Sequence, residues 1–227
     1  MQTETRPGLD FSRFRAAIFD LDGTLVHSEH AWEAARIEVL GQHGHVPSRA
    51  LLDAYVGRGL AGFLDEFFGP SLAPDRRRDI GNEIGAAADR LLPGMREAVP
   101  GASELLCNLH DAGLRIAICS SSPRRHIESA IDMLGIASRV ETIVSAAELP
   151  RGKPDPLPFS ATLEALDLTP RQACAFEDSL PGATSAFAAG LEVLAIGKGC
   201  TGPDFAFCHF RAEDFAELTQ TAEQSPR

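Results

Sequence analysis

The pattern of hydrophobic and polar positions along the chain changes near residue 100. Beyond that point, short apolar runs alternate with longer stretches in which apolar residues recur at helical spacing. The runs predict strands at 114–119, 140–144, 173–176, 192–196 and 207–210, in addition to an early strand at 16–19. The stretches between them predict helices at 103–110, 123–134, 156–166 and 181–189. Strands that alternate with helices are typical of a parallel sheet, so we predict a doubly wound, Rossmann-like α/β core.

The segment 28–93 has a different pattern, because its apolar residues recur only at helical spacing. The spacing predicts helices at 32–40, 48–56, 60–68 and 75–91, with Ser48 as an N-cap. We therefore predict an all-α cap domain over 28–93, inserted into a core made of 13–27 and 94–218, with flexible termini at 1–12 and 219–227. Since the insert follows the first strand directly, we expect it to lie over the edge of the sheet where that strand ends.

Composition narrows the classes of partner. The 227 residues are 44% hydrophobic and 23% charged, as in ordinary globular proteins. The net charge of -11 argues against binding to nucleic acid or to anionic membranes, and no apolar stretch is long enough to span a bilayer. The polar first ten residues do not resemble a signal peptide, and the five cysteines lack zinc-site spacing. We expect free thiols, a cytoplasmic location, and a monomer, with a dimer left open.

Two acids follow the predicted first strand, in the run Asp20-Leu21-Asp22-Gly23-Thr24-Leu25. Alternation along an extended segment directs Asp20 and Asp22 to the same side, and Gly23 allows the chain to turn sharply. Two carboxylates this close raise each other's pKa unless a cation or a shared proton lies between them. A Mg2+ ion bound by carboxylate and carbonyl oxygens is the usual solution. For this motif alone, a solvated turn is the alternative interpretation.

Three further polar segments follow predicted strands: Ser120 with Ser121, Lys153, and the pair Glu177-Asp178. Each has a simpler interpretation, because the serines or the acidic pair could cap the next helix and the lysine could lie in a solvated loop. However, the carboxyl ends of parallel strands share one edge of the sheet. Their joint occurrence there predicts one site, with acids for a metal and with a hydroxyl and an ammonium group for phosphate oxygens.

The chain resembles the haloacid dehalogenase-like hydrolase superfamily, in the subgroup whose helical cap is inserted after the first motif. The resemblance covers about 16–210 and depends on four motifs in order: DxDGTL at 20–25, Ser120, Lys153 in a Gly-Lys-Pro context, and the acidic pair within 177–182. By this resemblance, Asp20 is the nucleophile that becomes an aspartyl phosphate, and Asp22 is the general acid and base.

The resemblance also implies how metal and substrate are held. Mg2+ is expected on Asp20, on the backbone carbonyl of Asp22 and on Asp178, with Glu177 beside or behind it. The phosphoryl oxygens are expected on Ser120, on Ser121 and on Lys153. From the cap, Arg58, Trp32 and His30 are candidates for contact with the substrate, with core packing as the alternative for Trp32 and a surface position as the alternative for His30.

Several reactions occur on this scaffold. Dehalogenases of the family lack the acid at Asp22, and phosphonate-cleaving relatives need a cap lysine that 28–93 does not contain. A β-phosphoglucomutase-like mutase stays open, although such enzymes carry a histidine where Trp32 stands and an arginine near Leu60. A receiver-type signalling module or a catalytically silent binding protein fits the motifs or the length less well. We predict a Mg2+-dependent phosphatase for a small phosphorylated metabolite, such as a sugar phosphate or phosphoglycolate.

Overall fold

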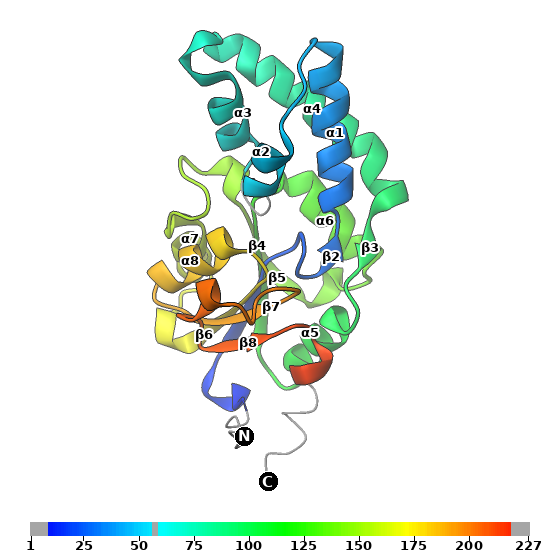
Figure 1. Cartoon of the computed structure of the whole chain (residues 1–227). Helices are drawn as coiled ribbons and strands as arrows, with labels where there is room; N and C mark the ends of the chain where they lie inside the picture. Colours follow the sequence, from blue (N-terminus) through cyan, green and yellow to red (C-terminus); the bar gives the residue numbers. More distant parts are fainter. Residues whose placement is uncertain (1–8, 56–58, 219–227) are drawn as a thin grey trace, which may run out of the picture.

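The computed structural model describes residues 9–55 and 59–218. Six strands form one parallel sheet in the order β5-β4-β1-β6-β7-β8 (Figure 1). Their bounds are β1 Ala16–Phe19, β4 Arg115–Ser120, β5 Val140–Ser145, β6 Ala173–Glu177, β7 Glu192–Ile196 and β8 Phe210–Ala212. The chain starts at the central strand, builds one side of the sheet and then returns to build the other. This order confirms the predicted doubly wound core.

The central strand β1 shows why the sheet is covered on both faces. All four of its residues are fully buried, and successive side chains point to opposite faces. Ala17 and Phe19 enter one apolar cluster, which α5 and α6 cover, whereas Ala16 and Ile18 enter a second cluster, which α7 and α8 cover. The four covering helices are α5 Ala102–Asp111, α6 Arg124–Met133, α7 Leu157–Ala165 and α8 Leu180–Ala188. A strand buried on both faces reads as a continuous apolar run, as this one does.

Four helices form the insert that follows β1: α1 Glu29–Gln42, α2 Arg49–Ala54, α3 Leu60–Phe68 and α4 Pro74–Met95. They share an apolar cluster of their own, to which Trp32, Phe63 and Ile84 contribute. Ser48 caps α2 as predicted, because its side chain accepts a hydrogen bond from the amide of Leu51. In Figure 1 the insert stands above the end of the sheet where the strands finish. None of the helices in the described ranges is long and apolar enough to cross a membrane.

A small two-stranded ladder joins the insert to the core. Strand β2, Val26–His27, leads into the insert, and β3, Glu97–Ala98, leads out of it. The two pair antiparallel, with Val26 opposite Ala98. The sequence did not predict this ladder, because two-residue strands carry no periodicity. The ladder holds both connections between insert and core side by side at one place.

Some element bounds differ from the predicted ones. The last helix of the insert continues past Pro93 to Met95, and its final hydrogen bond runs from the Arg96 amide to the Leu92 carbonyl. Strand β8 begins at Phe210, where the predicted strand ends. Residues 9–12 were expected to be flexible, yet Leu9 and Phe11 pack against the core. The other residues of the predicted flexible termini, 1–8 and 219–227, lie outside the described ranges.

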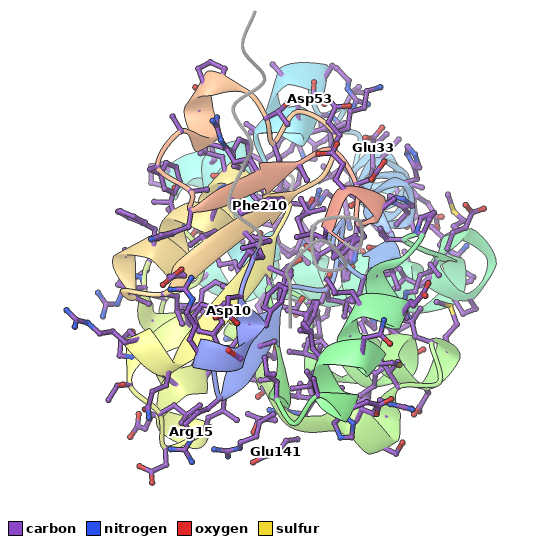
Figure 2. The ribbon with its side chains drawn as sticks, turned by 90° about the horizontal axis from the view of Figure 1, so that it is seen from below. Asp10, Arg15, Glu33, Asp53, Glu141 and Phe210 are labelled. Carbon is purple, nitrogen blue, oxygen red and sulfur yellow. The ribbon has the colours of Figure 1, made fainter. Side chains whose placement is uncertain are left out.

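Figure 2 views the molecule from below, from the end of the sheet opposite the insert, and shows Arg15 and Glu141 at one rim. Both residues are exposed and lie where strands begin. Six 3-10 helices complete the described fold: Phe11–Arg13, Gly69–Ser71, Ala137–Arg139, Ala146–Glu148, Pro170–Gln172 and Pro203–Phe205. All five cysteines are free thiols, as predicted.

Candidate active site

The carboxyl ends of the central strands bring the predicted polar residues together. Asp20 directly follows β1, Ser120 ends β4, and Glu177 ends β6. The Asp20 amide donates to the Phe176 carbonyl at 2.9 Å, which continues the β1–β6 ladder and places the two acids side by side. Lys153 enters from the loop between β5 and α7. Four segments that are far apart in the sequence therefore meet at one point.

Lys153 is the cation at the centre of this group. Its Nζ lies 2.5 Å from Asp20 Oδ1 and 2.5 Å from Glu177 Oε1, and it donates to the Cys119 carbonyl at 3.0 Å. Burial by itself would lower the pKa of Lys153, but the Asp20 and Glu177 carboxylates outweigh that effect and hold the pKa above its usual value. The side chain is 1% exposed. The alternative of a solvated loop lysine is therefore wrong.

Three carboxylates form a compact acidic cluster around this lysine. Asp20, Glu177 and Asp178 each offer an oxygen, and these oxygens all lie within 4.8 Å of one another. Burial raises the pKa of Asp20 well above its usual value, and Lys153 only partly opposes this. Burial also raises the pKa of Asp178, and the neighbouring carboxylates raise it further. Three carboxyl groups share one ammonium group, and an all-oxygen donor set of this kind fits a hard divalent cation.

Gly23 explains why a glycine must follow the two acids of the first motif. Its φ is +94°, a conformation that costs other residues free energy. In addition, a Cβ at this position would lie 2.0 Å from Asp178 Oδ2. The next residue, Thr24, donates its hydroxyl to Asp178 Oδ1 at 3.2 Å. The turn after β1 therefore both makes room for the Asp178 carboxylate and orients it.

Both carboxylate oxygens of Glu177 already have protein donors. Oε1 contacts Lys153, and Oε2 accepts from the amides of Asp178 and Ser179 at 3.2 and 3.3 Å and from the Ser179 hydroxyl at 3.1 Å. A Cβ at Gly182 would lie 1.9 Å from Oε1, so this acid needs a glycine in α8. The helix-capping alternative holds only for Ser179, which accepts from the Gly182 amide. Glu177 itself anchors the lysine.

The Asp22 carboxylate is held by hydroxyl groups. Ser28 donates to Oδ1, and Ser122 and Ser120 donate to Oδ2 at 2.6 and 3.3 Å. Among the described residues, the acidic cluster does not include the Asp22 side chain, which leaves its backbone carbonyl as the predicted metal ligand. Ser120 is fully buried and also accepts from the Ser122 amide at 3.0 Å. Its hydroxyl therefore orients Asp22, in addition to the predicted contact with a phosphoryl group.

Sequence reasoning missed Ser28 and Ser122 as partners of Asp22. It assigned the serine run before Pro123 either to phosphate binding or to a helix cap. In the structure, Pro123 occupies the N-cap position of α6 and no side chain caps that helix. The run of three serines after an apolar strand was the available signal for Ser122. For Ser28, the signal was its position directly after β2, where the chain enters the insert.

A cavity of about 1090 Å³ lies between the core and the insert. The core lines it with Asp20, Asp22, Ser120, Ser121 and Lys153, and the insert lines it with residues that include Trp32 and Arg36. Trp32 also packs against the His126 ring of α6, with 5.1 Å between centroids, so it has a packing role, and its contact with the substrate stays a prediction. His30 is exposed and does not line the cavity, so its predicted substrate contact is wrong. The predicted contact of Arg58 lies outside the described residues.

An ion-pair cluster connects the insert to the core at the rim of the cavity. Asp89 of α4 accepts from Arg125 Nε at 3.0 Å and also contacts His126 Nε2, and both partners belong to α6. Burial lowers the pKa of His126 and outweighs the opposing effect of Asp89.

The parallel sheet in this order, the buried acid–lysine cluster at its carboxyl edge and the helical insert define a doubly wound α/β enzyme. The chain belongs to the haloacid dehalogenase-like hydrolase family, because the family model with that description matches residues 14–190. It is a phosphatase of this family, because relatives that share 34%, 32% and 27% of their residues with it are named phosphatases.

Validoxylamine A 7'-phosphate phosphatase of Streptomyces hygroscopicus subsp. limoneus is 34% identical over 184 residues, which cover 78% of this chain and 83% of that protein. Phosphoglycolate phosphatase of Cereibacter sphaeroides is 32% identical, over 80% of this chain and 84% of that protein. Hexitol phosphatase B of Escherichia coli (strain K12) is 27% identical, over 90% of this chain and 94% of that protein.

Solved structures share the fold. The chain superimposes on β-phosphoglucomutase from Clostridium difficile with a TM-score of 0.82, over 93% of this chain and 98% of that one. At 17% identity this likeness concerns the fold alone. CbbY from Rhodobacter sphaeroides, solved in complex with phosphate, is 25% identical with a TM-score of 0.80. The match covers 90% of this chain and 96% of that one. The mutase interpretation is not favoured, since the relatives at higher identity are named phosphatases.

Proposed function

We propose that the protein is a Mg2+-dependent phosphatase that hydrolyses a small phosphomonoester, of the sugar phosphate or phosphoglycolate type, through an aspartyl phosphate on Asp20. The observation that carries this proposal is the buried contact between Asp20 and Lys153 at the floor of the cavity. A carboxylate and an ammonium group placed in this way suit phosphoryl transfer, which depends mainly on positioning and on charge stabilisation.

Asp20 acts first, as the nucleophile. One of its carboxylate oxygens attacks phosphorus, the bond from phosphorus to the leaving oxygen breaks, and that oxygen takes a proton from Asp22. A water molecule then attacks the phosphorus of the aspartyl phosphate. Asp22 takes a proton from this water, the Asp20–phosphorus bond breaks, and inorganic phosphate leaves. Lys153 holds Asp20 Oδ1 throughout and offsets the negative charge that develops.

The hydroxyl groups around Asp22 support its role as acid and base. Three serine hydroxyls hold its two carboxylate oxygens, so the group has one orientation toward the cavity. We assign Ser122 and Ser28 as residues that position Asp22.

The acidic cluster fits a bound Mg2+ ion. The Asp20 and Asp178 side chains and the Asp22 backbone carbonyl would hold it, with Glu177 positioning Lys153 behind them. When bound, the metal supplies positive charge beside the phosphoryl oxygens. The excess of carboxylates over cations in the cluster and the room that Gly23 leaves for Asp178 support this assignment.

The insert supplies the roof of the cavity and, in this proposal, selects the substrate. The relatives are named for three different phosphorylated compounds: a hexitol phosphate, phosphoglycolate and validoxylamine A 7'-phosphate. A small phosphorylated metabolite is the class these names share. The cap bounds of 28–93, a cytoplasmic location and a monomeric state stay predictions.

Hydrolysis of p-nitrophenyl phosphate by the full chain tests this proposal. We expect turnover with Mg2+ and none after chelation with EDTA, and we expect Asp20→Asn to abolish turnover without changing the circular dichroism spectrum. Asp53→Asn is the matched control, because Asp53 lies in the insert and is paired on the surface with Arg49. Turnover that persists in Asp20→Asn, or that is unaffected by chelation, would contradict the nucleophile or the metal assignment respectively.

A further inference from the structure

Five cationic residues among those described line the cavity, and four of them have acidic partners. Lys153 contacts Asp20 and Glu177, as described above. The arginines Arg77, Arg78 and Arg125 pair with Asp65, Asp75 and Asp89 respectively. The fifth, Arg36 of α1, has no hydrogen bond or ion pair within the described residues, and its Nε is a buried atom without a partner.

This arginine is also unusually buried for an unpaired charge. Arg36 is only 8% exposed, and its guanidinium lies over the Phe63 ring at 5.0 Å from the centroid. The aromatic face orients the cation and attracts it weakly, but it satisfies none of its five N–H donors. An unpaired buried charge is costly, so a residue kept in this state indicates that a ligand completes it.

The electrostatic surroundings of Arg36 point to an anion. Burial lowers its pKa to about 10, so the side chain stays charged at neutral pH. The carboxylates that act on it are those of Glu33 and Asp22. Glu33, labelled together with Asp53 in Figure 2, is already 2.7 Å from Arg49. Asp22 is held by serine hydroxyls. Both acids therefore have other partners, and the guanidinium is available to a group in the cavity.

We propose that Arg36 binds a second anionic group of the substrate, a carboxylate or a further phosphate, while the transferred phosphoryl group lies at Asp20. A guanidinium presents parallel N–H donors that match the two oxygens of such a group. A hydroxyl group offers neither the charge nor the second oxygen. This inference rests on the proposed function, because it assigns the other end of the same substrate.

Matched pairs of substrates test this assignment. Glycerol 3-phosphate and 3-phosphoglycerate differ by a carboxylate, and fructose 6-phosphate and fructose 1,6-bisphosphate differ by a phosphate. We expect the native chain to prefer the anionic member of at least one pair by tenfold or more in kcat/KM. The pair that shows the preference identifies which kind of anion the site takes. Equal kcat/KM for both members of both pairs would overturn the proposal.

The variant Arg36→Gln removes the charge and keeps an amide. We expect it to lower kcat/KM for the preferred anionic substrate by about a hundredfold, mainly through KM, because a hydrogen-bonded charge contact is lost. For the member of the pair that lacks the second anionic group, kcat/KM should change less than about threefold. Arg36→Lys should recover part of the loss. Arg78→Gln is the control, since Arg78 lines the same cavity but is paired and 68% exposed. If the ratio of kcat/KM between the two members of the pair were the same in Arg36→Gln as in the native chain, the assignment would be refuted.

The ratio between two substrates does not depend on the fraction of folded enzyme, so a poorly folding variant still gives an answer. Equilibrium binding separates this inference from the proposed function. In the Asp20→Asn background, calorimetry gives Kd for 3-phosphoglycerate and for glycerol 3-phosphate without turnover. If the native chain does not hydrolyse p-nitrophenyl phosphate, the proposed function fails. The effect of Arg36→Gln on the Kd ratio then decides the role of Arg36 by itself.

Discussion

The two sides of the cavity differ in how their charges are balanced. On the core side, Lys153 contacts two carboxylates, and hydroxyl groups hold Asp22. On the insert side, Arg36 lines the same space without a partner in the described chain. The core site is therefore organised before a substrate arrives, whereas the insert offers a charge that a ligand must complete. This division suits a family in which the reaction stays the same while the substrate differs from one member to another.

The largest expected effect comes from removing the core lysine. Lys153→Met leaves the Asp20 and Glu177 carboxylates buried without their cation, which should destabilise the fold by about 3 kcal/mol and lower kcat by about a thousandfold. Urea unfolding and p-nitrophenyl phosphate kinetics measure the two effects. Lys198→Met is the control, because Lys198 is the other lysine of the chain and does not line the cavity.

The Lys153→Met and Arg36→Gln variants should differ in which properties they change. Arg36→Gln is expected to change substrate preference without a comparable loss of stability or of p-nitrophenyl phosphate hydrolysis. If Lys153→Met retained a tenth of the native kcat, the core would not be organised around this cation and the contrast would be wrong.

A smaller effect is expected from Gly23→Ala. The added Cβ would meet Asp178 Oδ2 at 2.0 Å, so the acid must move away from Asp20 and Glu177. We expect kcat to fall by about a hundredfold, as follows from small misplacements of a reacting group. The concentration of Mg2+ needed for half-maximal activity should rise as well, and a metal titration of activity measures both.

Gly44→Ala is the matched control for Gly23→Ala. Gly44 has a φ of +77°, close to that of Gly23, but a Cβ there would meet nothing within 4 Å. Both variants carry the cost of a left-handed residue, about 1 kcal/mol of stability, and only one displaces an acid. Equal activity of the two variants would show that the position of Asp178 does not matter.

The next largest effect is expected from the serines around Asp22. Ser122→Ala removes a hydroxyl that lies 2.6 Å from Asp22 Oδ2, and we expect kcat to fall about tenfold because the carboxylate loses an orienting donor. Ser185→Ala is the control, since that buried serine donates over the same distance, 2.6 Å, to the Asp155 carbonyl away from the cavity. Single-turnover kinetics should show slower phosphate release. A full rate in Ser122→Ala would remove this serine from the proposed mechanism.

The core could be predicted from sequence far better than the insert side of the cavity. Strands β1 and β7 have the predicted bounds, because all their residues except Glu192, which begins β7, are apolar and almost fully buried. The polar residues that end or follow the strands were predicted for the same reason, since a parallel sheet brings all carboxyl ends to one edge. Here local pattern and topology together determine the position of a side chain.

Arg36 shows what such reasoning misses. Helical periodicity predicted α1, and Arg36 lies four residues after Trp32, next to Ala35 on the buried face of this helix. That spacing was the available signal, because an arginine on an apolar face needs a partner. Whether a partner exists depends on α3 and on the core below, which are distant in sequence. The pairing of β2 with β3 was hidden for a similar reason.

The smallest expected effect concerns the contact between the two sides. Asp89→Asn removes the ion pair with Arg125, leaves one polar contact to His126, and so loosens α4 against α6. Because Asp89 is 45% exposed, we expect a loss of only about 1 kcal/mol in urea unfolding. Asp75→Asn is the control, since it breaks a surface pair with Arg78 inside α4 alone.

The pH dependence of this contact has a defined sign. Burial alone would raise the pKa of Asp89, but its hydrogen bonds to Arg125 and His126 outweigh burial and hold the pKa below the usual 3.8. An acid with a lowered folded-state pKa contributes stability that is complete above the unfolded pKa and is lost as the pH falls through the folded one. The stability difference between the native chain and Asp89→Asn should therefore narrow as the pH falls below about 4, where Asp89 becomes protonated. A difference that stays unchanged below about pH 4 would mean that Asp89 does not join the insert to the core as a charged group.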